Sequence, residues 1–333
     1  MVELVDTEDL KSSGSDTMRV RVPLAAPQHK EIITQPHNSP SPDCGKNGCF
    51  FCYNSAIFFH QEGIFMLNMN EIRRIVVKIG SSTLTHASGN LNLRRIERLV
   101  RTVSDLQNRG LEMVLVSSGA VAAGTARLGL SERPKDLAFK QAAAAVGQCE
   151  LIHIYDKIFQ EYGITIAQIL LTRENIIDAE QRENIHNAFT ALLQTGVLPI
   201  VNENDTVATV ELKHIETFGD NDTLSAVVAR LCEADLLVIF SDIDGLYNAD
   251  PRKNPQARLI PHVSKIDAKI RKMAGGAGSA AGTGGMATKI TAAELCMDAG
   301  IPMLVANGDK HGILYDIVDG KSVGTLFARE IDL

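Results

Sequence analysis

The chain has 333 residues, of which 45% are hydrophobic, and this is enough for one large α/β domain or two modest ones. Its formal net charge is −7 and it has no dense basic block, which argues against nucleic acid as the main partner. No apolar run approaches the roughly 20 residues that cross a bilayer, and the acidic start lacks the apolar segment of a secretory signal, so we expect a cytoplasmic protein with no membrane partner.

The first part of the chain differs from the rest. Residues 1–68 have no sustained periodicity and contain prolines, serines and isolated aromatic residues. We therefore predict a disordered leader over 1–68, a start-site or cloning extension, followed by a single domain over 69–333. The natural start would then be Met66 or Met69.

A cysteine cluster lies within this leader. Cys44, Cys49 and Cys52, with His60 nearby, could bind zinc or an iron–sulfur cluster. A fourth ligand at a suitable spacing is uncertain, so accidental clustering is the simpler interpretation. We predict no metal site in the chain.

From residue 70 onward, short apolar runs alternate with longer helical patterns. Strands are predicted at 74–78, 112–117, 164–170, 197–201, 235–240 and 301–306, with short hairpin strands at 213–215 and 258–260. Helices are predicted at 92–109, 119–128, 136–161, 181–195, 222–232 and 286–299. This alternation predicts an α/β fold, a three-layer αβα sandwich with a central, mainly parallel sheet. The cysteines within the helical segments are expected to be reduced core residues: Cys149, Cys232 and Cys296.

A lysine and a glycine follow the first predicted strand, in the segment Lys78-Ile79-Gly80-Ser81-Ser82-Thr83. An ammonium group, hydroxyls and free N–H groups would then lie at the carboxyl edge of the sheet, where open α/β sheets bind ligands. An ordinary strand-to-helix turn with an exposed lysine is the alternative interpretation. The same pattern returns at 117–124, where Ser118 and Gly119 follow the next strand.

A second glycine-rich loop ends in a lysine at the start of the last long helix. Its sequence is Gly282-Thr283-Gly284-Gly285-Met286-Ala287-Thr288-Lys289. It does not match the P-loop pattern, but backbone N–H groups, a helix N-terminus and a lysine together can hold phosphate. A flexible linker is the alternative, and the first lysine loop makes phosphate binding the better interpretation.

Polar clusters follow two of the predicted strands, at 202–206 and 241–247, and a third opens a predicted helix at 218–223. Helix capping accounts for part of the second cluster, because Asp and Asn are preferred caps. It does not account for two acidic clusters in one short span of an otherwise hydrophobic region.

With these segments in order, the chain resembles the amino-acid kinase family, and most closely its glutamate 5-kinase branch, over about residues 72–329. The matching segments are 77–82, 117–120, 168–173, 201–205, 219–222, 245–251 and 282–289. Two features depart from the family: the leader, and the end of the chain where many bacterial members continue into a small RNA-binding-like (PUA) domain. We expect no such domain here.

The resemblance implies transfer of the γ-phosphoryl group of ATP to the side-chain carboxylate of L-glutamate, with Mg²⁺ carried on ATP rather than held by protein ligands. It implies that Lys78 and Lys289 hold the phosphoryl group and that Asp222 positions both. It assigns glutamate binding to Ser118, Asp205 and Asn221. It assigns ATP binding to Lys78, Ser241, Asp242, Thr283, Gly284, Gly285, Met286, Ala287, Thr288 and Lys289.

The resemblance also suggests partners: proline as a feedback inhibitor acting near the loop at 211–217, glutamyl phosphate reductase, and further copies of the chain in a homo-oligomer. Three alternatives stay open. A sister carboxylate or carbamate kinase could share the fold. A non-catalytic amino-acid sensor would be favoured if the lysines were missing, and both are present. A metal-binding module at the cysteine cluster, carrying a kinase-like passenger, is the third.

Overall fold

The computed structural model describes residues 55–60, 63–86, 88–207, 220–275, 285–310 and 312–329, and only the backbone over 55–66. Several predicted features lie outside the described residues: the cysteine cluster, the hairpin strand at 213–215, the loop at 211–217, and the site residues Thr283 and Gly284. None of the helices in the described ranges is long and apolar enough to cross a membrane.

The described chain begins with an antiparallel hairpin of β1 (Ser55–His60) and β2 (Gly63–Asn68). We expected no regular element before residue 69. The reason for the difference lies in the sequence of β2, whose apolar residues run consecutively and give no alternating signal. Leu67 at its end is 7% exposed and packs in the hydrophobic core. Regular structure therefore begins before the boundary that we expected.

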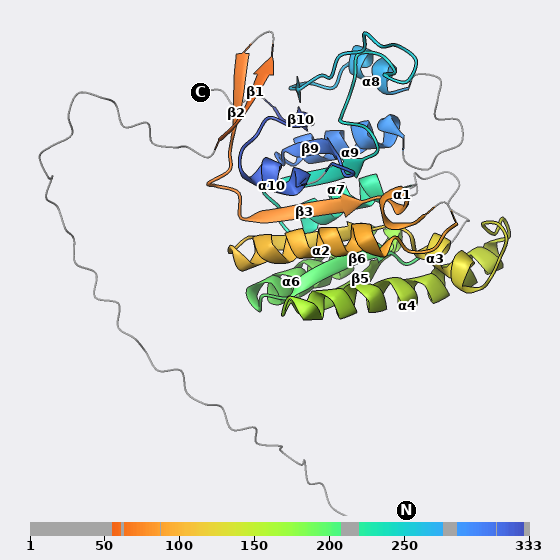
Figure 1. Cartoon of the computed structure of the whole chain (residues 1–333). Helices are drawn as coiled ribbons and strands as arrows, with labels where there is room; N and C mark the ends of the chain where they lie inside the picture. Colours follow the sequence, from red (N-terminus) through yellow and green to blue (C-terminus); the bar gives the residue numbers. More distant parts are fainter. Residues whose placement is uncertain are drawn as a thin grey trace, which may run out of the picture. The chain divides into compact units, whose positions relative to one another are not determined.

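An eight-stranded sheet forms the centre of the domain (Figure 1). Its strands are β3 (Arg74–Ile79), β4 (Glu112–Ser117), β5 (Ile166–Leu171), β6 (Leu198–Glu203), β7 (Leu236–Ser241), β8 (His262–Val263), β9 (Met303–Asn307) and β10 (Thr325–Phe327). The spatial order is β5-β6-β4-β3-β7-β9-β10-β8, and every neighbouring pair is parallel except β9 and β10. The predicted mainly parallel sheet is confirmed.

Helices cover both faces of this sheet. One face carries α2 (Leu93–Asn108), α4 (Leu137–Glu161) and α10 (Ile313–Val318), and the other carries α6 (Ala179–Gln194), α7 (Asn221–Leu231) and α9 (Met286–Asp298). Successive residues of a strand point to opposite faces. In β7, accordingly, Val238 and Phe240 pack on the first face while Leu237 and Ile239 pack on the second. The predicted three-layer αβα sandwich is confirmed.

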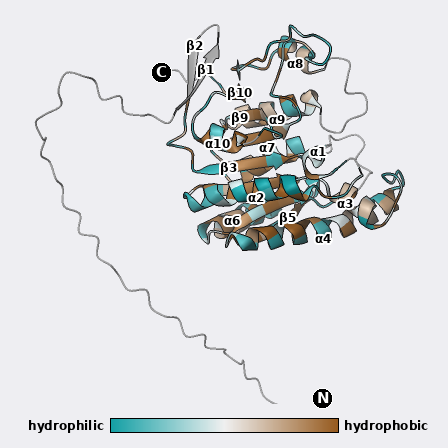
Figure 2. Cartoon of the chain, in the orientation of Figure 1, coloured by the Kyte–Doolittle hydropathy of each residue, from teal (hydrophilic) through white to brown (hydrophobic). Residues whose placement is uncertain are grey.

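The central strands are apolar along most of their length because water reaches neither face of the sheet. Figure 2 shows hydrophilic residues on the outer surface of α2, whose buried side carries Ile96, Val100, Val103 and Leu106. The predicted strands at 74–78, 112–117, 164–170, 197–201, 235–240 and 301–306, and all six predicted helices, match observed elements to within two residues at each end. The segment 258–260 forms only a single bridge, between Leu259 and Tyr247.

Two glycines allow α3 (Ala120–Arg127) to cross α4 at backbone contact. A Cβ atom at Gly124 would lie 1.7 Å from the carbonyl oxygen of Ala143, and one at Gly147 would lie 1.7 Å from that of Ala120. No side chain larger than hydrogen fits at either position. The close contact between the helices holds the start of α3 against α4. The turn that carries Ser118 comes directly before this start.

One cysteine prediction is wrong. Cys232 and Cys296 are buried, as expected, whereas Cys149 is exposed. The buried side of α4 is set by Gly147, Leu151 and Tyr155, which recur every four residues. Cys149 lies midway between the first two of these and therefore points to the opposite side of the helix.

Candidate active site

The polar segments that follow the predicted strands meet at one edge of the sheet. Because the strands are parallel, the carboxyl ends of β3, β4, β6, β7 and β9 lie along the same edge. Ile79 pairs in register with Ser117, and Ser241 pairs with Asn307. The residues just beyond these pairs therefore share one face of the molecule, which is where open α/β sheets place ligands.

A buried aspartate between two lysines is the centre of this edge. Asp222 is 0% exposed, and its Oδ1 lies 2.6 Å from Nζ of Lys78 while its Oδ2 lies 3.1 Å from Nζ of Lys289. The lysines are 6% and 4% exposed. The hydroxyl of Thr288 donates to Oδ2 of Asp222 at 2.7 Å. The structure thus brings together three residues that are up to 211 positions apart in the chain.

Each of the three is fixed by the element that carries it. Lys78 is the penultimate residue of β3. Asp222 lies in the first turn of α7, and this turn is capped by Asp220, which accepts hydrogen bonds from the N–H groups of Asp222 (2.8 Å) and Thr223 (2.9 Å). Lys289 lies in the first turn of α9, where Gly285 provides no side-chain cap. The first N–H groups of α9 are left to bind an anion.

The ionisation of this triad follows from its surroundings. Burial would raise the pKa of Asp222, but the ammonium groups of Lys78 and Lys289, with the hydrogen bond from Thr288, lower it below its ordinary value. One carboxylate between two ammonium groups leaves one positive charge in excess. The triad is therefore suited to a negatively charged ligand and not to a cation.

A hydrogen-bonded amide group lies beside the triad. Nδ2 of Asn221 lies 2.7 Å from Oγ of Ser118, 3.1 Å from the carbonyl oxygen of Ser117 and 3.1 Å from Oδ1 of Asn202. Asn202 donates in turn to Oε1 of Gln148 at 2.8 Å. This group holds the predicted substrate residues Ser118 and Asn221 together.

Sequence reasoning did not single out Gln148 as a member of this group. The available signal was a glutamine among the small residues of α4, one position after the buried Gly147. A polar side chain at the edge of a buried helix face needs a partner. Asn202, on the neighbouring strand β6, supplies it.

Three carboxyl groups gather near the amide group and are poorly compensated. Burial raises the pKa of Asp205, and the charges of Lys140 and Arg133 only partly oppose the shift. Burial also raises the pKa of Glu203, with the charge of Asp205 adding to it, and burial likewise raises that of Asp220. Such a cluster favours the approach of a ligand cation, because a positive charge would relieve the desolvated carboxylates.

The end of β7 carries the remaining predicted residues. Ser241 is buried, and its Oγ lies 3.4 Å from Oδ1 of Asp242. Oδ2 of Asp242 is paired with Nη2 of Arg252 at 2.6 Å. Met286 and Ala287 open α9, together with Thr288 and Lys289. β7 pairs in parallel with β3, where Val77 is in register with Val238.

Asp244, which belongs to the polar cluster at 241–247, forms a further polar group at this edge, with partners that were not predicted. Oδ1 of Asp244 accepts from Asn307 at 3.0 Å, and its Oδ2 lies 2.9 Å from Nζ of Lys310. Burial would raise the pKa of Asp244, but the hydrogen bonds from Lys310 and Asn307 lower it. No local spacing in the sequence indicates these contacts, because Asn307 and Lys310 lie more than sixty residues further along the chain.

Comparisons of the sequence with known proteins point to one family of kinases. Residues 73–307 match the family described as the Amino acid kinase family. A "Glutamate 5-kinase" from Clostridium tetani is 57% identical over 259 residues, which cover 78% of this chain and 96% of that protein. A "Glutamate 5-kinase" from Carboxydothermus hydrogenoformans is 55% identical over 260 residues, which cover 78% of this chain and 68% of that protein.

Solved structures show the same fold at low sequence identity. The UMP kinase of Bacillus anthracis superposes with a TM-score of 0.53 at 16% identity, over 79% of this chain and 98% of that one. The UMP kinase of Ureaplasma parvum gives a TM-score of 0.53 at 16% identity, over 78% of this chain and 100% of that one. At this identity the likeness concerns the fold alone.

Proposed function

The chain belongs to the amino acid kinase family, in its glutamate 5-kinase branch, and from this premise we propose that it transfers the γ-phosphoryl group of ATP to the side-chain carboxylate of L-glutamate. The observation that carries the proposal is the buried Asp222 with an ammonium group on each of its oxygens, at the edge of the sheet where ligands bind. The product is glutamyl 5-phosphate, the first intermediate on the route to proline.

The chemistry requires charge neutralisation more than proton transfer. The acceptor carboxylate is already a nucleophile, and the negative charge spreads over the oxygens of the phosphoryl group as it moves. Lys78 and Lys289 neutralise that charge from two sides. Asp222 holds both ammonium groups in position before the substrates arrive, so little reorganisation is needed during the transfer.

The acceptor lies on the side of the amide group. Ser118 and Asn221 bind the carboxylate end of glutamate, and their mutual hydrogen bond of 2.7 Å fixes the spacing of the two polar groups. Asp205 pairs with the α-ammonium group. Burial raises the pKa of Asp205, and the charges of Lys140 and Arg133 offset only part of this shift. The positive charge of the substrate would stabilise the carboxylate further.

The nucleotide lies on the other side of Lys78. Ser241, Asp242 and the start of α9, with Met286 and Ala287, contact ATP, and the phosphates rest on the N–H groups that follow Gly285. The family resemblance adds Thr283 and Gly284 to the nucleotide-binding residues. Both oxygens of Asp222 are engaged by Lys78, Lys289 and Thr288. The residues at the centre therefore suit Mg²⁺ that arrives on ATP, where it neutralises phosphate charge, and not an ion held by the protein.

The proposed activity also implies an inhibitor, a partner enzyme and a site of action in the cell. Proline shares the α-ammonium and α-carboxylate of glutamate and would compete for Asp205. The family resemblance adds residues 211–217 to those that affect this inhibition. The acyl phosphate product is labile, so direct use by glutamyl phosphate reductase is expected. We place the reaction in the cytoplasm, catalysed by a homo-oligomer.

The test measures the product directly. Purified protein is incubated with ATP, Mg²⁺ and L-glutamate in hydroxylamine, which traps glutamyl phosphate as a hydroxamate. We expect hydroxamate to form with glutamate and not with N-acetylglutamate, which has no ammonium group for Asp205. Faster turnover of UMP, carbamate or N-acetylglutamate than of glutamate would contradict the assignment.

A further inference from the structure

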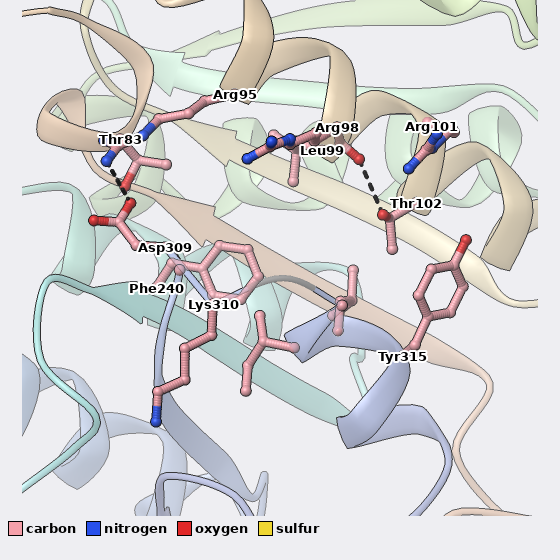
Figure 3. A pocket seen from close by; sticks show the side chains of 14 residues that line it. Thr83, Arg95, Arg98, Leu99, Arg101, Thr102, Phe240, Asp309, Lys310 and Tyr315 are labelled. Carbon is pink, nitrogen blue, oxygen red and sulfur yellow. Dashed lines mark hydrogen bonds and ion pairs between the residues drawn. The ribbon is translucent and has the colours of Figure 1, made fainter.

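A cavity of about 130 Å³ lies between α2 and α10, lined by residues of both helices and of the segments beside them. Figure 3 shows Arg95, Arg98 and Arg101 of α2 along one wall, with Phe240, Lys310 and Tyr315 on the opposite wall. Nothing in the proposed kinase reaction uses this cavity.

The cavity is separate from the candidate active site. The side chain of Phe240 packs in the layer that holds α2 and α10, so the cavity lies on that face of the sheet. Asp222 and Lys289 begin α7 and α9, which cover the opposite face. The sheet itself therefore separates this cavity from the two lysines on Asp222.

The walls of the cavity carry an excess of positive charge. Four lining residues are cationic (Arg95, Arg98, Arg101 and Lys310) and one, Asp309, is anionic, in a chain of net charge −7. Arg95 is paired with Asp309 at 2.8 Å, and Lys310 is paired with Asp244.

The guanidinium group of Arg98 differs from these. Across the described ranges of the chain, no acidic side chain forms an ion pair with Arg98 or Arg101. Arg98 is half-buried. The nearby hydroxyl of Thr102 donates to the carbonyl oxygen of Arg98 and does not contact its guanidinium group. A half-buried guanidinium with donors to spare is a binding group for a carboxylate or phosphate.

The rest of the lining is apolar. Phe240, Ile313 and Leu314 belong to the core that packs on this face of the sheet, and Leu99 packs against it. A bare inorganic ion would leave these surfaces in contact with water, whereas a hydrocarbon group would cover them. The volume is also well below the roughly 300 Å³ at which drug-sized pockets begin, which excludes a nucleotide.

We propose that this cavity binds a small organic anion, with its charged group on Arg98 and its hydrocarbon part against Phe240 and Leu99. The charged group can be a carboxylate or a phosphate. Both accept two hydrogen bonds from one guanidinium group.

Binding is measured with isovalerate as the probe, next to isovaleramide, which has the same shape without the charge, and inorganic phosphate, which has the charge without the hydrocarbon. The chain contains no tryptophan, so Tyr315→Trp places a single fluorescent reporter at the cavity. Calorimetry on the unaltered protein repeats the titration without the reporter. We expect saturable binding of isovalerate, with isovaleramide and phosphate each weaker by roughly tenfold or more, because a charge-assisted hydrogen bond or the apolar contact is lost.

Two substitutions in α2 locate the site. Arg98→Gln is expected to weaken isovalerate binding by roughly tenfold or more, and Arg94→Gln, an exposed position of the same helix that does not line the cavity, is expected to leave it unchanged. Equal binding by Arg98→Gln and the unaltered protein would overturn the proposal. Displacement of isovalerate by ATP or by glutamate would also overturn it, because the probe would then occupy the active site.

Discussion

Replacement of Asp222 by asparagine removes one charge from the centre of the site and changes little else. The asparagine has the same shape, and its Oδ atom can still accept from Thr288. The two ammonium groups, which lie 2.6 and 3.1 Å from the carboxylate in the unaltered protein, lose their counterion in a buried place. Breaking a buried ion pair by removing one partner typically costs about 3–5 kcal/mol.

This cost predicts two separate losses. For a domain of this size, 3 kcal/mol corresponds to a fall in Tm of roughly 6 °C or more. The lysines are also no longer held in the geometry that the transferring phosphoryl group needs, so kcat should fall by about 10²–10³-fold, as for the loss of one electrostatic group in a preorganised site. Thermal unfolding and the hydroxamate assay measure the two effects on the same preparation.

The neighbouring aspartate provides the control for stability. Asp220 caps α7 through its Oδ1, and asparagine is an equally preferred N-cap, so Asp220→Asn should not lower Tm. A variant Asp222→Asn that kept both its Tm and a kcat within threefold of the unaltered protein would refute the role that we assign to the buried carboxylate.

Three more substitutions test other parts of the structure. Asp205→Asn should raise the KM for glutamate by roughly tenfold or more. The same substitution should raise Tm at neutral pH, because burial raises the pKa of Asp205 and so disfavours its ionised form in the folded protein. This gain in Tm should vanish as the pH falls to the ordinary aspartate value of 3.8, and a lower Tm at neutral pH would contradict the prediction. Lys289→Ala should lower kcat by about 10²–10³-fold with little change in the KM for glutamate, and steady-state kinetics showing the reverse would place this lysine in substrate binding. Gly147→Ala should reduce the free energy of unfolding by about 3 kcal/mol or more, since its Cβ would lie 1.7 Å from the carbonyl oxygen of Ala120. Gly275→Ala is the control in denaturant unfolding, because its nearest described contact would be the carbonyl oxygen of Arg271 at 3.5 Å. Equal stability of the two variants would contradict the close crossing.

The layers of the fold were predictable because burial leaves a strong pattern in the sequence. The strand 236–241 is apolar up to its last residue, Ser241, since Leu237 and Val238 face different helix layers and neither meets water. The long helices show equally clear periodicity. Elements of a few residues carry too little pattern to be recognised, and α1 (Ser81–Leu84), α5 (Arg173–Ile177), α8 (Ala268–Ala274) and α10 were not predicted for that reason.

The site was predictable only in part from the residues themselves. Glycine-rich loops marked the surroundings of Lys78 and Lys289, but no local pattern indicates that Asp222 lies between them, because their contact depends on the order of the strands. The family resemblance supplied that pairing. Interactions such as those of Gln148 with Asn202, or of Asp244 with Lys310, join distant segments through single polar side chains. Neither leaves a repeated spacing in the sequence.

The strand order has a consequence for how such a protein can change. β3 pairs with β4 on one side, with β6 beyond it, and with β7 on the other side. β4 leads to Ser118, β6 carries Asn202, and β7 ends at Ser241. Lys78 thus stands on the border between a half that would select the acceptor and a half that would hold the nucleotide. Loops on the acceptor half can be exchanged without disturbing the nucleotide half. A designer could accordingly redirect this scaffold to a different acid by rebuilding only the segments after β4 and β6, keeping the border strand and its partner aspartate intact.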